Sequence, residues 1–209
     1  MIQRDFYNSS AITAFVKNAL HEDIGDGDIT SLSVVSPNAT GLANCIVKEP
    51  CIIAGVSLAY EICKIVDPAL QVSFSCTDGE AITQVPICIG TITGHLASIL
   101  KAERLLLNCM QRMSGIATKT QQFVQILAPK GIAVYDTRKT TPNFRLPEKW
   151  AVHIGGGTNH RFGLDDQILI KDNHIAAAGG VAAAVKAARL SVGHMVKIEA
   201  EVDHIAQIE

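Results

Sequence analysis

Three short apolar runs in the second half of the chain begin roughly 30 residues apart, and this spacing restricts the fold more than any other feature. The runs cover residues 132–135, 167–170 and 195–202, and an Ala-rich helical pattern over 181–190 precedes the third. Strands that alternate with helices in this way are typical of βα units in a parallel sheet or barrel. The side chains do not repeat at this period, so a solenoid is not expected.

The first half of the chain has a different rhythm, in which short β-like runs alternate with helical patterns. We predict strands over 45–48, 51–54, 72–76 and 87–92, and helices over 11–20, 56–66, 98–113 and 116–127. Ser9 and Ser10 are suitable caps for the first helix. The sequence therefore predicts a mixed α+β domain over residues 1–113, followed by an α/β domain over 114–209.

Composition excludes several classes of protein. The 48% hydrophobic content is too high for a disordered chain, and a net charge of −2 argues against a nucleic-acid binder. The N-terminus has no unbroken apolar stretch of signal-peptide length, and no run in the chain approaches the length of a membrane span. The six cysteines are scattered without a CxxC pair, which favours buried thiols in a reducing compartment. We therefore expect a soluble cytoplasmic protein that binds neither membrane nor nucleic acid.

Ionic side chains follow or end all three predicted strands of the second half. They occupy residues 136–139 after the first strand, 171–174 after the second, and Glu199 and Glu201 in the third. The carboxyl ends of the strands form the site face of βα barrels and open α/β sheets. The sequence therefore places a candidate site at these strand ends.

Two loops in this region each allow two interpretations. Residues 136–142 carry Arg138, Lys139 and three threonines, which suit either an anion cradle or a solvated loop. The three glycines at 155–157 match neither a P-loop nor a dinucleotide fingerprint. They either let backbone amides approach a ligand or let the chain turn, and the neighbouring His160 and Arg161 favour a ligand slightly.

The acidic residues give no metal site of their own. Glu199 and Glu201 share one face of a strand, where they need a cation, a metal or substrate hydroxyls unless the strand is an exposed edge. The histidines form no HExxH, and no Cys/His cluster has zinc spacing. Residues 22–30 resemble a calcium loop, but Val34 and Pro37 stand where a bidentate Glu is required, so a helix end and a turn are expected.

Seven segments of the chain together resemble one family, the quinolinate phosphoribosyltransferases, also called nicotinate-nucleotide pyrophosphorylases (carboxylating). They lie between residues 22 and 202 in the order that the family has them: EDIGDGDIT, AERLLLNCMQRMSGIAT, YDTRKTTP, EKWAV, GGGTNHRFGL, LIKDNHI and EAEV. One such segment is a weak signal, whereas seven in order are a strong one.

The resemblance implies a type II phosphoribosyltransferase fold, in which an α/β sandwich-like N-terminal domain precedes an incomplete TIM-like α/β barrel. It implies a homodimer, or a multiple of dimers, with shared active sites. The family reaction joins quinolinate to phosphoribosyl pyrophosphate and yields nicotinate mononucleotide, pyrophosphate and CO2, in NAD biosynthesis. Mg2+ accompanies the phosphoribosyl pyrophosphate, and no protein metal site is implied.

The resemblance also assigns roles to individual residues. The quinolinate carboxylates would be contacted by Arg138, His160, Arg161 and Lys171, and Arg104 would reach the partner subunit's site. A cationic floor would consist of Thr137, Arg138, Lys139 and Lys171, with Lys139 nearest the pyrophosphate. Glu201 would bind the ribose hydroxyls, with Glu199 beside it. The catalytic roles fall to Lys139, Lys171 and Glu201.

Two departures from the family pattern leave alternatives open. Asn143 stands where the family usually has Gly after TTP, and we expect this change to be tolerated. The family chain runs on for several more βα units, so a truncated, non-catalytic chain is one alternative. A molybdenum-transport-associated or nicotinate-using relative is another, although the cations at 104, 138, 139, 161 and 171 favour the quinolinate enzyme.

Overall fold

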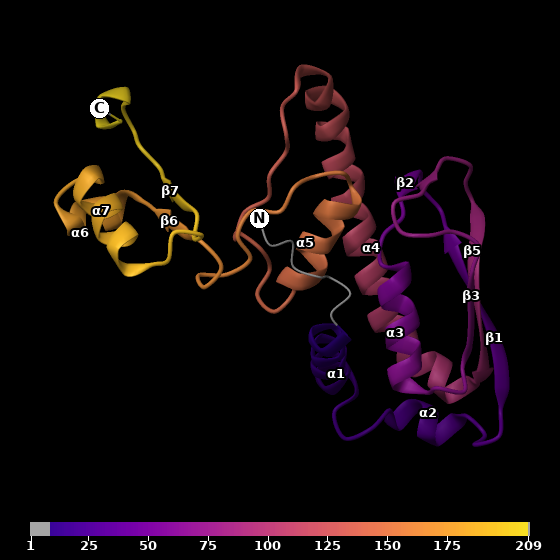
Figure 1. Cartoon of the computed structure of the whole chain (residues 1–209). Coiled ribbons are helices and arrows are strands. Elements are labelled where there is room, and N and C mark those ends of the chain that lie inside the picture. The colour runs from indigo at the N-terminus through magenta and orange to yellow at the C-terminus, as the bar shows by residue number, and fades with distance from the viewer. Residues whose placement is uncertain (1–8, 209) are drawn as a thin grey trace. The chain divides into compact units, whose positions relative to one another are not determined.

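The computed structural model describes residues 9–208, which form two compact units that join between Asn159 and His160 (Figure 1). The first unit mixes helices with antiparallel strands, and the second pairs parallel strands with helices. The predicted domain boundary after Met113 falls inside a helix and stays a prediction. Within the described residues, no helix is both long and apolar enough to cross a membrane.

An antiparallel sheet with the strand order β1-β5-β3 forms one layer of the first unit. Its strands are β1 (Thr40–Val47), β5 (Ile87–His95) and β3 (Gln71–Phe74), while β2 (Cys51–Ile52) pairs with β4 (Ala81–Ile82). Exposure alternates along β1, which turns Ala43, Cys45 and Val47 toward the core. The four predicted strands are therefore present with shifted ends, and β4 is additional.

Helices form the second layer, along the inner face of this sheet (Figure 1). They are α1 (Ser9–Ile24), α3 (Val56–Val66) and α4 (Leu96–Leu127), and both α1 and α3 pack against α4. The core between the layers includes fully buried Ile62, Ile89 and Met113. Each such side chain contributes about 1.5–3 kcal/mol through burial. The predicted Ser9 and Ser10 caps are wrong, because both residues belong to α1.

The prediction of two helices separated at Gly115 is wrong, because α4 is a single helix of 32 residues. Its buried positions recur along one face from Ile99 through Met113 to Thr120, so packing continues past the glycine. A glycine inside a helix costs only about 1 kcal/mol. Burial on both sides of Gly115 outweighs that cost.

The acidic segment at residues 22–30 forms a helix end and a turn, as expected. Helix α1 ends at Ile24, and Gly25 and Gly27 turn the chain with positive φ. Asp28 then caps α2 (Ile29–Val34), where its carboxylate accepts a hydrogen bond from Ser31 N at 2.9 Å. The sequence did not predict α2, because six residues are too short to show a helical period.

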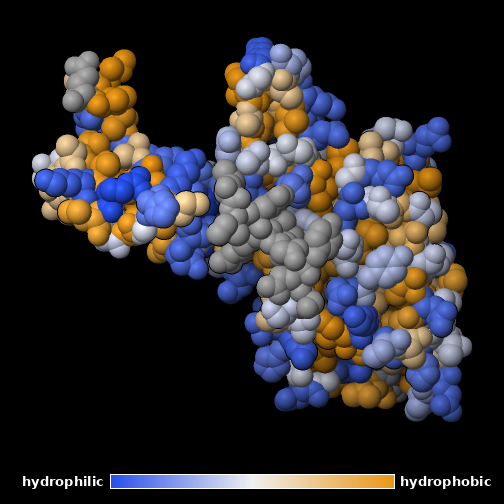
Figure 2. All heavy atoms as spheres, viewed as in Figure 1, coloured by the Kyte–Doolittle hydropathy of each residue, from blue (hydrophilic) through white to orange (hydrophobic). Residues whose placement is uncertain are grey.

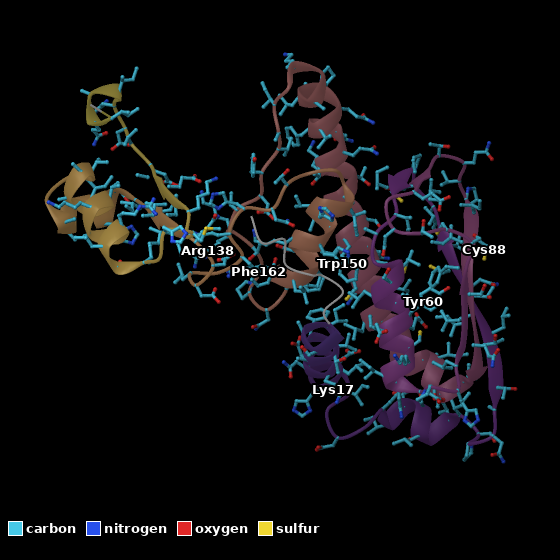
Figure 3. The ribbon with its side chains drawn as sticks, in the orientation of Figure 1. Lys17, Tyr60, Cys88, Arg138, Trp150 and Phe162 are labelled. Carbon is cyan, nitrogen blue, oxygen red and sulfur yellow. The ribbon has the colours of Figure 1, made fainter. Side chains whose placement is uncertain are left out.

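Helix α5 (Arg145–Ile154) packs on α4 and closes the first unit. Trp150, which is 2% exposed, anchors it (Figure 3). The strand predicted over residues 132–135, after η1 (Ala128–Lys130), is wrong: Tyr135 makes an isolated parallel bridge with Thr158. Within the described residues that bridge is the segment's whole pairing, which is too little to build a ladder.

The glycines after α5 serve packing and a turn. A Cβ at Gly155 would lie 2.5 Å from Ala117 O on α4, and one at Gly157 would lie 2.9 Å from Thr120 Cγ2. Gly156, between them, has a φ of +86°. The structure therefore favours the turn interpretation of this segment, in which α5 approaches α4 more closely than a side chain allows.

The second unit contains parallel strands β6 (Ile168–Ile170) and β7 (Ile198–Ala200). Its helices are α6 (Asp172–Ala178), α7 (Val181–Ser191) and the 3-10 turn η2 (Ile205–Gln207). The predicted helix over 181–190 is confirmed, both strands are shorter than predicted, and α6 was not predicted. Large apolar side chains, among them Leu190, Met195 and Ile205, are at least 80% exposed, and Figure 2 shows apolar atoms on this unit's surface.

All six cysteines lie within the described residues and are free thiols. Cys63, Cys76 and Cys109 are buried, and burial raises the pKa of Cys109 to about 12. The expectation of buried thiols is wrong for Cys88, which is exposed on β5 (Figure 3).

Gly155, which packs against α4, and Gly115, which lies within α4, give a matched pair of substitutions. Gly155→Ala is expected to lower the free energy of unfolding by about 1–3 kcal/mol, because the new methyl group would collide with the α4 backbone. Gly115→Ala is expected to raise it by about 0.5–1 kcal/mol, because a Cβ there meets no described atom within 4 Å. Urea unfolding measures both, and equal effects would contradict the packing argument.

Lys149 on α5 is 1% exposed and forms an ion pair with Asp136, whose side chain is 8% exposed. Lys149→Met is expected to lower the free energy of unfolding by about 3–5 kcal/mol, because it leaves a buried carboxylate without its cation. The double substitution Asp136→Asn/Lys149→Met should cost less, because it removes both charges. Chemical denaturation compares the two proteins, and a double variant less stable than the single one would refute this account.

Candidate functional site

The parallel register of β6 and β7 brings two predicted site residues together at the strand ends. Ile170 lies opposite Ala200, and Glu201 N donates to Ile170 O at 2.9 Å, which extends the ladder by one residue. Lys171 and Glu201 therefore leave the sheet at the same edge. Lys171 Nζ lies 2.9 Å from Glu201 Oε1, and both side chains are about half exposed.

A second pair joins Glu199, two residues before Glu201, to His160, which precedes β6. His160 Nε2 is 3.2 Å from Glu199 Oε2, and Gln167 Nε2 is 3.3 Å from His160 Nδ1. The Gln167 amide nitrogen can donate to Nδ1 in the tautomer that carries its proton on Nε2, which then faces Glu199. Each glutamate of this strand thus has a nitrogen partner, and neither is an unpaired carboxylate on an edge strand.

Arg161 lies beside these pairs and is 7% exposed. Its Nη1 donates to Gln167 O at 3.4 Å, while its Nε has no hydrogen-bond partner among the described residues. The following loop is held by Asp166, whose carboxylate accepts from the amides of Phe162 and Gly163. A buried guanidinium with an unused donor has capacity for an anionic ligand.

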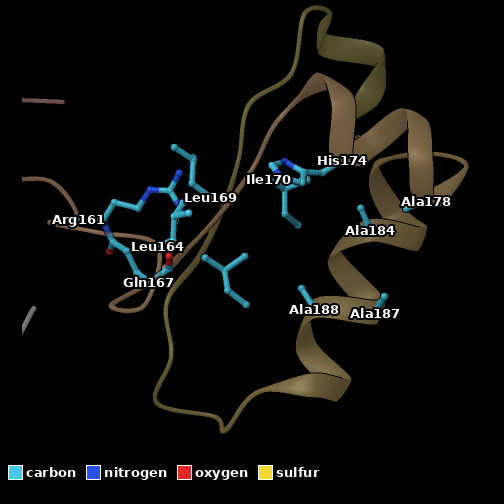
Figure 4. A pocket seen from close by; sticks show the side chains of 11 residues that line it. Arg161, Leu164, Gln167, Leu169, Ile170, His174, Ala178, Ala184, Ala187 and Ala188 are labelled. Atoms are coloured by element: carbon cyan, nitrogen blue, oxygen red, sulfur yellow. Dashed lines mark hydrogen bonds between the residues drawn. The ribbon is translucent and has the colours of Figure 1, made fainter. Parts of the chain in front are cut away.

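A hollow of about 390 Å3 adjoins Arg161 inside the second unit. Figure 4 shows Arg161 and Gln167 on one side of it and the alanines of α7 on the other. Small side chains leave this space open between β6 and α7.

The segment at residues 136–142, which the sequence left open between an anion cradle and a solvated loop, lies in the first unit. Thr137 Oγ1 accepts from Lys139 N at 3.0 Å, which folds the loop back on itself. Thr137 and Lys139 are exposed, and Arg138 is half-buried with an Nε that has no hydrogen-bond partner within residues 9–208. The loop therefore presents two adjacent cations and a hydroxyl, which suits an anion with several oxygen atoms.

Glu148 supports the far end of this loop. Its Oε1 accepts from Thr141 Oγ1 at 2.8 Å and from Arg112 Nη2 at 2.9 Å, and its Oε2 accepts from Thr141 N at 3.1 Å. Burial acts to raise the pKa of Glu148, but the hydrogen bonds from Arg112 and Thr141 outweigh it and hold the pKa below its ordinary value. Glu148 is therefore ionised at neutral pH.

Lys149 and Asn159 support the near end. Asn159 Nδ2 donates to Asp136 Oδ2 at 2.6 Å and to Lys149 O at 2.8 Å, beside the buried Lys149–Asp136 pair. No role was predicted from the sequence for Glu148, Lys149 or Asn159. The charged pair in EKWAV, directly before a Trp, was the available signal.

Arg104 lies on α4 with a side chain that is 62% exposed, 3.7 Å from its neighbour Glu103. The structure places the predicted site residues in two groups, one in each unit. The first unit holds Arg104, Thr137, Arg138 and Lys139, and the second holds His160, Arg161, Lys171, Glu199 and Glu201. Among the described residues, no three His, Cys, Asp or Glu side chains converge on a position that could hold a metal ion.

Comparison with known proteins links this geometry to one family. Residues 28–114 match the N-terminal domain of quinolinate phosphoribosyl transferase, and residues 116–209 match its C-terminal domain. A probable nicotinate-nucleotide pyrophosphorylase [carboxylating] from Bacillus subtilis is 44% identical over 187 residues, which is 90% of this chain and 64% of the relative. The chloroplastic enzyme of Arabidopsis thaliana is 46% identical over 84% of this chain and 50% of its own length.

Solved structures agree in fold. The NadC structure from Streptococcus pyogenes superposes with a TM-score of 0.88 at 36% identity, covering 98% of this chain and 72% of that one. The nicotinate-nucleotide pyrophosphorylase from Francisella tularensis gives 0.85 at 38% identity, covering 95% and 70%. The chain thus has the predicted α/β type II phosphoribosyltransferase fold and spans about two thirds or less of the curated relatives it matches. It belongs to the quinolinate phosphoribosyltransferase family.

Proposed function

We propose that this chain binds quinolinate and phosphoribosyl pyrophosphate and transfers the phosphoribosyl group to quinolinate with decarboxylation. The observation that carries the proposal is the pair of arginines, Arg138 and Arg161, whose Nε atoms have no hydrogen-bond partner among residues 9–208. Both lie in segments that match the family. Both substrates are polyanions, and fixed cations offset the cost of removing them from water.

The proposed reaction needs no protein nucleophile. The quinolinate ring nitrogen attacks the anomeric carbon, and the bond from that carbon to pyrophosphate breaks with its electron pair on the leaving oxygen. The carboxylate next to the ring nitrogen then leaves as CO2, and the pyridinium ring stabilises the electron pair left behind until that carbon takes a proton. The residues therefore contribute orientation and charge stabilisation.

The ion pair between Lys171 and Glu201 at the strand ends can separate so that each side chain binds a substrate group instead. Without substrate, Lys171 and Glu201 satisfy each other at 2.9 Å. In the proposed complex, Lys171 turns to a quinolinate carboxylate, and Glu201 accepts from ribose hydroxyls, with Glu199 beside it. Arg138, His160 and Arg161 would complete the carboxylate contacts, and Lys139, beside Thr137, would face the pyrophosphate. Since both side chains of the Lys171–Glu201 pair are about half exposed, separating them costs little.

Magnesium belongs to the proposal as part of the substrate. Its ligands of choice are phosphate oxygens and water, which phosphoribosyl pyrophosphate brings with it. We also propose a cytoplasmic homodimer, or a multiple of dimers, in which Arg104 completes the partner's site.

Lys139 should be essential for turnover. Lys139→Ala is expected to raise the barrier by roughly 2–4 kcal/mol, because one cation facing the pyrophosphate is lost. The fold should be unaffected, since the side chain is exposed. Steady-state formation of nicotinate mononucleotide measures the effect, with Lys119→Ala on α4 as the control. Activity of Lys139→Ala within threefold of wild type would remove Lys139 from the site.

Quinolinate should bind far better than nicotinate. Nicotinate has one carboxylate instead of two, so it would leave at least one guanidinium unpaired in a partly dehydrated site, and a site built to pair such a group rejects the analogue by about 10⁴-fold. Competition titration calorimetry measures the ratio even without turnover. Comparable dissociation constants would favour a relative that uses a monocarboxylate.

Arg104 should act in the partner's site. Mixing inactive Arg104→Ala and Lys139→Ala chains is expected to restore activity, because a heterodimer then contains one site with both residues intact. Heterodimer formation is verified by affinity tags on the two chains. An inactive mixture that contains verified heterodimers would show that Arg104 serves its own subunit or no site.

A further inference from the structure

Two consecutive residues of α5 with opposite charge hold the two ends of the loop at residues 136–141. Glu148 accepts from Thr141 at the far end, and Lys149 pairs with Asp136 at the near end. Glu148 is 7% exposed and Lys149 is 1% exposed, which is rare for charged residues so close to a loop. Arg138 and Lys139 lie between the two attachment points.

We propose that Glu148 and Lys149 are positioning residues that set the geometry of Arg138 and Lys139 for anion binding. Neither contacts a substrate in the proposed reaction, and each acts through the loop. The inference rests on the proposed function for its consequence, namely anion affinity. The attachment itself rests on the contacts alone.

The charges of the two residues fit this role. An ionised Glu148 can accept from Thr141 N, Thr141 Oγ1 and Arg112 at the same time. Arg112 belongs to α4, so the far end of the loop is tied through Glu148 to the longest helix of the unit. At the near end, Lys149 neutralises Asp136, and Asn159 takes the second carboxylate oxygen. The adjacent charges of Arg138 and Lys139 repel each other. Attachment of the loop at both ends limits how far the two side chains can separate.

The attachment of Glu148 is tested first without any ligand. Hydrogen exchange of the Thr141 amide should be roughly tenfold faster or more in Glu148→Ala, because its acceptor is gone. Glu148→Gln keeps an acceptor oxygen but loses the charge that holds Arg112, so its exchange rate should be intermediate. Glu61→Gln, which removes a carboxylate that pairs with Lys64 on α3, should leave it unchanged. Unchanged exchange in both Glu148 variants would overturn the proposal.

The consequence for binding is tested with inorganic pyrophosphate in titration calorimetry. Glu148→Gln should weaken its binding roughly tenfold, as is typical when a supporting residue is lost, and Glu61→Gln should not. In the Lys139→Ala background the same substitution should have a smaller effect, because one of the two cations that Glu148 positions is absent. Equal fold-changes in both backgrounds would show a general effect on the fold and would overturn the positioning role.

The near end is tested with the charge-free double variant Asp136→Asn/Lys149→Met, which avoids a buried unpaired charge. It should also weaken pyrophosphate binding roughly tenfold, and unchanged affinity would exclude Lys149 from the role. Wild-type chain that binds neither pyrophosphate nor quinolinate would contradict the proposed function, whereas the Thr141 exchange rates would still decide the attachment by Glu148.

Discussion

The burial of charge at the start of α5 is the constraint on which the candidate anion loop depends. Lys149 is almost inaccessible to water, so its charge requires the carboxylate of Asp136 as a partner. Because Asp136 is the first residue of the loop, this ion pair fixes where the loop begins. Trp150 and Ala151, which follow in the same helix, pack into the core and leave α5 little freedom to move. Packing between α4 and α5 therefore decides where the cations of residues 136–141 can lie.

In the second unit, strand register and not buried charge positions the charged side chains. Parallel pairing of β6 with β7 leads Lys171 and Glu201 out at one edge, and their ion pair is exposed and weak. The first unit thus carries a loop of cations whose ends are attached to buried charges, and the second carries exposed ion pairs at its strand ends.

The sequence predicted most elements that have a clear hydrophobic pattern, and it predicted poorly those that are short or depend on distant contacts. Spacing alone placed Lys171 and Glu201 at neighbouring strand ends, and the helix over 181–190 was evident from its composition. Gly115 misled the prediction of α4, because burial on both sides of it is a tertiary effect. Glu148 looked like an ordinary charge in the first turn of a helix, and no local pattern shows that it is buried against Thr141 and Arg112. Asn143, where the family usually has Gly, has a φ of +62°, a conformation that Asn adopts more readily than other non-glycine residues.

The central claim is that Arg138 and Arg161 hold donor capacity for quinolinate. The most direct measurement follows the arginine Nε–H resonances by nuclear magnetic resonance while quinolinate is added to the wild-type chain. The account predicts saturable shifts of the Arg138 and Arg161 resonances with one dissociation constant, and no comparable shift of Arg112, whose Nε is 3.3 Å from Glu148 Oε1. Saturation of the protein with quinolinate without a shift at either Arg138 or Arg161 would contradict it.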